Sequence, residues 1–247
     1  MKFYWKSILT FFGLICLGST GVWFIEFPAE SQTLPPDVGL ITQLSGEATY
    51  WNETYQKTPE KAQVFMKIRR GDHFKVVSGT MIQLVYFQNG RQETWKGLAE
   101  LMVGDGESRI EGEKGAQVKP EVLILPVDTS QGMRRIPVLL RRARLSRSGA
   151  MQVRGAGEAS QKAIIPSREE RAEIAMARET YQKLRKQTKA DDITPELNLL
   201  GILADYEQYE AMEKIIKEAL KVQPGNEVLK ELDEWVKAQK SKGTIKK

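Results

Sequence analysis

Hydrophobic and polar positions change their spacing twice along this chain. Residues 7–25 form one run without a charged side chain. Residues 38–128 alternate short apolar segments with glycine-bearing turns, a pattern typical of β-strands. From residue 167 onward, apolar residues recur every three or four positions, as in amphipathic helices. The order predicts an N-terminal membrane helix, an all-β domain and a helical domain, so we expect a segregated α+β fold.

The apolar run near the N-terminus predicts export. A helix needs about twenty mostly apolar residues to cross the bilayer core, and the stretch from Ile8 to Phe27 meets that length. Positive charge before it and acidic charge after it place the remaining chain outside the cytoplasm. Small residues at positions 18–20 also permit cleavage, so residues 1–27 are either a signal anchor or a signal peptide. We expect a bacterial inner-membrane protein with a single span through residues 7–27 and its bulk in the periplasm, or a periplasmic protein if the leader is cleaved.

Charge and cysteine content narrow the function. The chain has 37 basic and 32 acidic residues, and its positive excess lies within residues 129–166. A short basic segment differs from the broadly basic surface that binds nucleic acid, so no nucleic-acid partner is expected. Cys16 is the only cysteine and lies in the apolar run, which excludes an intramolecular disulfide.

The β domain is expected to follow a linker at residues 28–37. Its clearest hairpin signal is Asn89-Gly90, because both residues accept the positive φ of a tight turn. Thr80–Phe87 is apolar on nearly both faces, which predicts a central strand covered on both sides. Regular short strands separated by glycine turns predict a sandwich or a small barrel over residues 38–128.

Four features follow one another within residues 38–110: the Gly46 hairpin, an apolar lead into Gly71-Asp72, the turn Ser78-Gly79-Thr80 and the segment from Leu84 to Gly90. Their order resembles a known family, the FecR-type periplasmic domain. The resemblance implies a compact β domain outside the inner membrane. In the best-known members this domain relays a signal from an outer-membrane receptor to a cytoplasmic sigma factor. That role needs a folded domain before the membrane span, and about six residues cannot bury a core, so we expect a recognition or scaffold domain.

An arginine-rich connector is expected at residues 129–166. Val138–Ser146 and Ala150–Arg154 read as a hairpin around Ser148-Gly149, with apolar and basic side chains on opposite faces. The stretch is either a polyanion-binding surface, since arginine pairs well with phosphate and carboxylate, or a solvated edge strand protected by charge. The candidate polyanion-binding residues are Arg134, Arg135, Arg141, Arg142, Arg144 and Arg147.

The last part, residues 167–240, reads as a series of helices before a basic tail at 241–247. Ser167 and Glu170 form a capping box, and Thr194 is expected to cap a helix that has Pro195 at its first position. Residues 193–226 resemble one divergent tetratricopeptide unit, which implies a concave groove for a partner protein. The candidate groove residues are Leu200, Leu203, Tyr209, Ile216 and Trp235.

Catalytic residues are hard to assemble from this sequence. His73, beside Asp72, is the only histidine, and we interpret it as a surface or capping residue. Neither a metal triad nor a phosphate-binding loop is present, so no cofactor and no enzymatic activity are expected. Trp51, Tyr55 and Trp95 are either core residues or a sugar-stacking surface. We therefore expect a non-enzymatic envelope scaffold that binds a partner protein through its helices; the alternative is a protein that binds peptidoglycan or an anionic polysaccharide.

Overall fold

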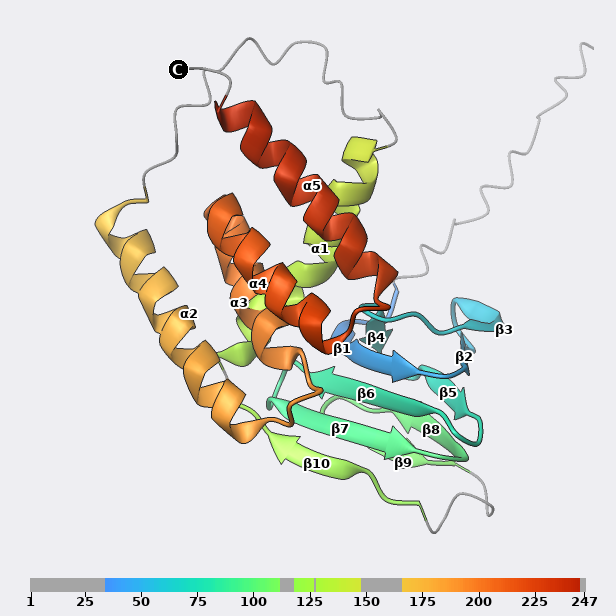
Figure 1. Ribbon diagram of the computed structural model, residues 1–247. Coiled ribbons are helices and arrows are strands. Elements are labelled where there is room, and N and C mark those ends of the chain that lie inside the picture. The colour runs from blue at the N-terminus through green and yellow to red at the C-terminus, as the bar shows by residue number, and fades with distance from the viewer. Residues whose placement is uncertain (1–33, 112–117, 127, 148–165, 245–247) are drawn as a thin grey trace, which may run out of the picture. The chain divides into compact units, whose positions relative to one another are not determined.

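The computed structural model describes residues 34–111, 118–126, 128–147 and 166–244 (Figure 1). Within these ranges strands precede helices, so the expected segregated α+β class is confirmed. The strands are β1 (Asp37–Ser45), β2 (Ala48–Asn52), β3 (Gln56–Lys61), β4 (Lys67–Arg69), β5 (His73–Val76), β6 (Met81–Tyr86), β7 (Arg91–Lys96), β8 (Ala99–Val103), β9 (Ser108–Ile110) and β10 (Glu121–Ile124). The helices are α1 (Thr129–Arg147), α2 (Arg168–Gln187), α3 (Thr194–Asp205), α4 (Tyr209–Val222) and α5 (Glu227–Thr244).

The strands form two antiparallel sheets. The first sheet has the order β10-β7-β6-β1-β4, and the second has the order β3-β2-β5-β8-β9. Apolar side chains of both sheets share one buried cluster, which includes Phe74 from the second sheet and Trp95 from the first. The β unit is therefore a sandwich; of the two predicted architectures, the closed barrel was wrong.

Strand β6 lies at the centre of the first sheet and is covered on both faces, as predicted. Ile82, Leu84 and Tyr86 belong to the cluster between the sheets. Val85, on the opposite face, packs against Leu184 of α2. Helices thus cover the outer face of the first sheet, and Figure 1 shows α2 and α3 beside β6 and β7.

The predicted turn at Asn89-Gly90 is also present. Gly90 has φ +66°, a left-handed backbone conformation that residues other than glycine rarely adopt. The Asn89 Oδ1 atom accepts a hydrogen bond from the backbone N–H of Arg91 at 3.1 Å. A Cβ at position 90 would lie 2.4 Å from the carbonyl oxygen of Leu125, so the approach of the chain beside β10 also requires glycine.

A buried polar cluster attaches the helices to the first sheet. Gln83 Nε2 donates to Asp192 Oδ1 at 3.1 Å, and Gln92 Nε2 donates to Asp192 Oδ2 at 2.8 Å. The backbone N–H of Thr194 donates to Asp192 Oδ1 at 2.8 Å. Because buried polar groups are costly unless paired, these hydrogen bonds specify where the start of α3 meets the sheet.

Helix α3 is the centre of the helical layer, and eleven of its twelve residues are buried. It crosses α1 at very short range, at Gly132 and Gly201. A Cβ at Gly132 would lie 2.1 Å from the carbonyl oxygen of Asn198, and one at Gly201 would lie 2.1 Å from the carbonyl oxygen of Gly132. Only glycine allows this backbone contact.

The hairpin prediction for residues 138–146 was wrong, because this segment is part of helix α1. Met133, Ile136, Leu140 and Ala143 recur at intervals of three and four and are all buried. That spacing is helical over the full length of α1. The alternation of arginine with Ala143 and Leu145 spans too few residues to distinguish a strand from a helix.

The predicted helix starts are close to the observed ones. Ser167 caps α2 in a complete capping box with Glu170, as predicted. For α3 the cap is Ile193 and not Thr194, although a proline does occupy the first turn. Asp192 supplies the side-chain acceptor there, so the capping signal lay two residues before the predicted one.

Some predictions lie outside the described residues. The expected membrane span at 7–27, most of the linker at 28–37, and the second strand at 150–154 belong to this group. Among the residues that the structure describes, no helix combines the length and apolar character needed to cross a membrane.

Candidate functional site

Helix α1 has one buried face and one basic face. Its buried side chains pack against α3 and against loop residues of the β unit, which include Phe65 and Phe87. Its exposed residues include Arg134, Arg141, Arg142 and Arg144. Val138 lies among them, with an exposed fraction of 49%. We call the outward surface the α1 arginine face; it consists of Arg134, Val138, Arg141, Arg142 and Arg144. The helix contains no acidic residue, so its charges are unbalanced within the element itself.

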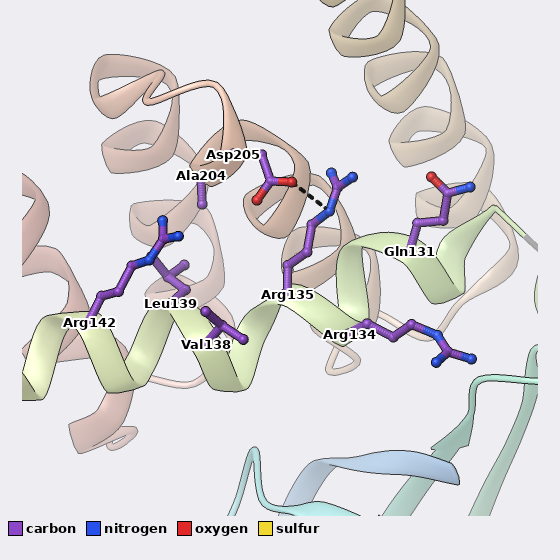
Figure 2. A pocket seen from close by; sticks show the side chains of 8 residues that line it. All are labelled: Gln131, Arg134, Arg135, Val138, Leu139, Arg142, Ala204 and Asp205. Carbon is purple, nitrogen blue, oxygen red and sulfur yellow. Dashed lines mark ion pairs between the residues drawn. The ribbon is translucent and has the colours of Figure 1, made fainter. Parts of the chain in front are cut away.

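A pocket of about 380 Å³ lies between α1 and the end of α3. We call it the α1–α3 pocket; its lining residues are Gln131, Arg134, Arg135, Val138, Leu139, Arg142, Ala204 and Asp205. Figure 2 shows Val138 and Leu139 between the side chains of Arg135 and Arg142. The pocket thus combines an apolar floor with basic groups at its edges.

Two of the pocket's arginines already have partners within the chain. Arg135 Nε donates to Asp205 Oδ2 at 2.9 Å, and its Nη2 lies 3.6 Å from a carboxylate oxygen of Glu173. Arg134 extends toward the sheet in Figure 2, where its guanidinium lies 4.7 Å from the ring centroid of Phe87. Arg135 therefore joins α1 to α2 and α3, and Arg134 stabilises the contact with the sheet.

The other three arginines of the face have no such partner. Arg141, Arg142 and Arg144 are exposed, and none of them forms an ion pair with a described residue. Arg142 lies near Tyr209, whose pKa is raised by burial and by the charge of Glu207, with Arg142 opposing that change. These three cations are available to an external anion.

A second pocket of about 380 Å³ lies on the other side of α1, against the sheets. We call it the α1–β pocket; its lining residues are Tyr50, Tyr55, Gln63, Val64, Phe65, Met66, Lys67, Arg69, Pro137, Leu140, Arg141, Arg144 and Leu145. Phe65 has φ +64°, a strained conformation for a bulky side chain, and it is buried in the helical cluster. Packing against the helices therefore sets the shape of this loop.

The tyrosines of the α1–β pocket are held by their own neighbours. Tyr55 Oη donates to Asp72 Oδ1 at 2.6 Å, and burial together with this bond raises the pKa of Tyr55. The Arg69 guanidinium lies 4.9 Å from the ring centroid of Tyr55. Tyr50 stacks on Phe74, with ring centroids 6.0 Å apart. Each ring thus has one face occupied by the protein.

Asp72 and His73 do not form a catalytic pair. Besides Tyr55, the Asp72 carboxylate accepts a bond from Asn52 Nδ2 at 2.8 Å, and burial raises its pKa. His73 Nδ1 instead lies 2.6 Å from Glu111 Oε2, and the ring stacks on Trp51 with centroids 5.1 Å apart. The two side chains serve different local contacts, so this arrangement offers no general base beside a nucleophile. The structure describes no group of three or more histidine, cysteine or acidic side chains that could hold a metal.

The residues predicted to line a partner groove lie mostly in the core. Leu200, Leu203 and Ile216 are at most 1% exposed, because α3 is surrounded by neighbouring helices. Tyr209 and Trp235 are partly exposed and form an edge-to-face pair with centroids 5.9 Å apart. Leu200, Leu203 and Ile216 therefore cannot contact a partner without unfolding. Among the aromatic candidates of the β unit, Trp95 is also buried.

The predicted basic residues lie on one helix and are divided between two pockets, which the hairpin interpretation could not indicate: Arg134, Arg135 and Arg142 line the α1–α3 pocket, and Arg141 and Arg144 line the α1–β pocket. The side chain of Arg147, at the end of α1, lies outside the described residues. Val138 was missed as a site residue. Its signal is the spacing of Arg134, Val138, Arg141 and Arg142, which lie on one side of a helix.

Comparisons with protein-family models, with curated proteins and with solved structures give no match for this chain. The FecR-type resemblance of residues 38–110 and the tetratricopeptide resemblance of residues 193–226 therefore stay predictions from their residues. The functional argument depends on the site itself.

Proposed function

We propose that this protein is a non-enzymatic binding protein of the bacterial envelope, anchored or released by its N-terminal segment. In this proposal the sandwich is a FecR-like scaffold domain, and the helices, related to tetratricopeptide hairpins, bind a partner protein. The two-sheet architecture with its glycine turns supports the first part. Support for the second comes from α3, α4 and α5, which are joined by short turns and pack in succession.

One observation carries this proposal: three exposed arginines on α1 have no ion-pair partner among the described residues. Arg142 lines the α1–α3 pocket, and Arg141 and Arg144 line the α1–β pocket. Exposed cations without a carboxylate partner add little to the stability of the fold, so these three arginines are available for binding. Basic side chains around an apolar floor are suited to binding, whereas catalysis would need a positioned acid, base or nucleophile.

Photocross-linking in living cells tests this proposal. A photoreactive amino acid is placed at position 138, on the α1 arginine face, and separately at position 176, an exposed apolar site on α2. We expect one adduct of discrete mass from position 138, identified by mass spectrometry as an envelope protein, and none from position 176. Equal labelling of many proteins at both positions would contradict a specific interaction.

The export part of the proposal has its own test. A reporter enzyme that is active only outside the cytoplasm is fused to the C-terminus of the full chain, and the mature N-terminus is identified by mass spectrometry. Activity of this fusion is expected. Activity only from a cytoplasmic reporter would contradict the envelope location.

Binding of an anionic polysaccharide is the second candidate, because the α1–β pocket combines Tyr50 and Tyr55 with Arg141 and Arg144. Aromatic rings stack on sugars, and guanidinium groups bind carboxylates or phosphates. Co-sedimentation with purified peptidoglycan that retains its anionic polymers tests this candidate. Salt-sensitive binding that is lost in Arg141→Gln/Arg144→Gln would favour it over a protein partner.

A further inference from the structure

We infer that the α1 arginine face binds an acidic segment of a partner protein, with one apolar side chain of that segment against Val138 in the α1–α3 pocket. This inference rests on the proposed function and names the chemistry of the partner. It draws on two properties of the face, its uncompensated positive charge and its single exposed apolar residue.

Charge complementarity is the first argument. Helix α1 carries six arginines and no acidic residue, and the ion pairs of Arg135 with Asp205 and Glu173 neutralise only part of this charge. Arginine binds carboxylates through two parallel N–H donors, so the face is suited to glutamate and aspartate side chains. A basic partner would be repelled.

The dimensions of the face are the second argument. Arg134 and Arg144 are ten positions apart, which is about 15 Å along a helix at 1.5 Å per residue. An acidic helix of about three turns matches that length, with carboxylates reaching the arginines on both sides of a central apolar residue. Val138 lies between the basic groups of the α1–α3 pocket, where Figure 2 shows it beside Leu139.

The exposed valine also favours a peptide over a polysaccharide. Its neighbours Leu139 and Ala204 make the floor of the pocket apolar, and a sugar polymer has no hydrocarbon side chain to bury there. The residues that line the α1–α3 pocket include no aromatic ring on which a sugar could stack. An acidic amphipathic segment would pair its carboxylates with the arginines of the α1 arginine face and bury an apolar side chain against Val138.

Fluorescence anisotropy with the full chain in detergent tests this inference. The probe is a labelled helical peptide of about sixteen residues, or ~24 Å, made of glutamate with leucine at every third or fourth position. Three comparison probes are the same peptide with leucine changed to serine, the same peptide with glutamate changed to lysine, and polygalacturonate. We expect the acidic amphipathic peptide to bind best, and its affinity to fall with rising salt because screening weakens exposed ion pairs.

Variants locate the binding. Arg141→Glu/Arg142→Glu is expected to lower the affinity at least about tenfold, because like charges then face the peptide. Val138→Asp is expected to lower it by a similar factor. The controls on α2, Arg178→Glu and Met176→Asp, make the same kinds of change at exposed positions, arginine to glutamate and an apolar residue to aspartate, and are expected to stay within about twofold. Circular dichroism checks each variant's fold, and Arg142→Gln replaces the double variant if that one unfolds.

Three results would overturn the inference: binding that persists in Arg141→Glu/Arg142→Glu, equal affinity for the serine and leucine peptides, or preference for polygalacturonate. A preference for polygalacturonate would indicate that the α1 arginine face binds an anionic polysaccharide. If the acidic peptide does not bind, the photocross-linking experiment at position 138 still tests the proposed function. An adduct identified in that experiment would then indicate a partner of different chemistry. An adduct lost in Arg141→Glu/Arg142→Glu cells would support both proposals.

Discussion

Helices α1 and α2 are both amphipathic and rich in arginine, yet they use their charges in opposite ways. In α2, Lys183 pairs with Glu179 one turn earlier, and Arg185 pairs with Glu196 of α3. In α1, Arg135 alone forms an ion pair among the described residues, while Arg141 and Arg142 form none. Arg185 of α2 thus serves the fold, whereas Arg141 and Arg142 of α1 remain available for binding.

The difference follows from what each helix faces. Glu196 is almost fully buried, so its carboxylate needs the guanidinium of Arg185 at 3.0 Å and the hydroxyl of Tyr181 at 3.1 Å. The outward side of α1 faces the two pockets, and the carboxylate partners found there among the described residues are Asp205 and Glu173, both bound to Arg135. An exposed arginine without a carboxylate adds little stability, so Arg141 and Arg142 can serve binding at little cost to the fold.

The largest effect is expected from breaking the buried ion pair of α2. Arg185→Met leaves the Glu196 carboxylate buried without its cation, which costs about 3–5 kcal/mol of unfolding free energy by analogy with other buried pairs. Arg178→Met, an exposed position on the same helix, is the matched control and should change stability by no more than ~0.5 kcal/mol. Urea denaturation measures both. Equal losses of unfolding free energy in the two variants would mean that the paired Arg185 stabilises the fold no more than the exposed Arg178.

A smaller loss is expected where α1 crosses α3. Gly132→Ala places a Cβ against the backbone oxygen of Asn198, and overpacking of this kind costs about 1–3 kcal/mol. Gly225→Ala is the control, since nothing lies within 4 Å of a Cβ there. Thermal unfolding followed by circular dichroism should show a lower midpoint for Gly132→Ala only. An unchanged midpoint would mean that the two helices do not hold this close contact.

Alkaline pH should weaken the attachment of α2 through Tyr181. Burial and the neighbouring Glu196 raise the pKa of Tyr181 to about 12, above its usual value of 10.0. The folded state therefore keeps a proton that the unfolded state loses, so this contribution is complete below pH 10 and disappears as pH rises to about 12. Denaturation midpoints measured from pH 9 to pH 12 should fall less steeply in Tyr181→Phe than in the unchanged protein. Identical slopes would contradict this coupling.

The smallest effect on stability is expected at the α1 arginine face. Arg142→Gln removes an exposed cation that has no carboxylate partner among the described residues, so the unfolding free energy should change by less than about 0.5 kcal/mol. Urea denaturation in low and high salt measures this change. A loss of more than ~1 kcal/mol would assign Arg142 a structural role and remove the contrast between α1 and α2.

Much of the fold could be predicted from local patterns. The capping box at Ser167 involves residues three positions apart, and the turn at Asn89-Gly90 involves adjacent ones, so both are present in the sequence itself. The strand at Thr80–Phe87 was predicted to be covered on both faces because both of its faces are apolar. These features depend on contacts within a few residues, where propensity and patterning decide the outcome.

The candidate site was only half predictable. The arginines are visible as a cluster, but a short alternation of basic and apolar residues within α1 suggested a strand. The helical period is clear only over the whole of residues 129–147, where the buried residues from Met133 to Ala143 repeat every three or four positions. The groove prediction was wrong for Leu200 and Leu203 because a helical stripe does not indicate whether another helix of the same chain covers it.

By itself, the sequence determined that strands precede helices, where α2 to α5 lie, and the local turn chemistry, because these depend on neighbouring residues. Only the tertiary structure decided which charges are used internally, since Arg185 meets Glu196 across eleven positions and Arg135 meets Asp205 across seventy. It also decided that the apolar residues of α3 are core and that Val138 is exposed. Such outcomes depend on which element covers which face, and packing between distant segments sets that arrangement.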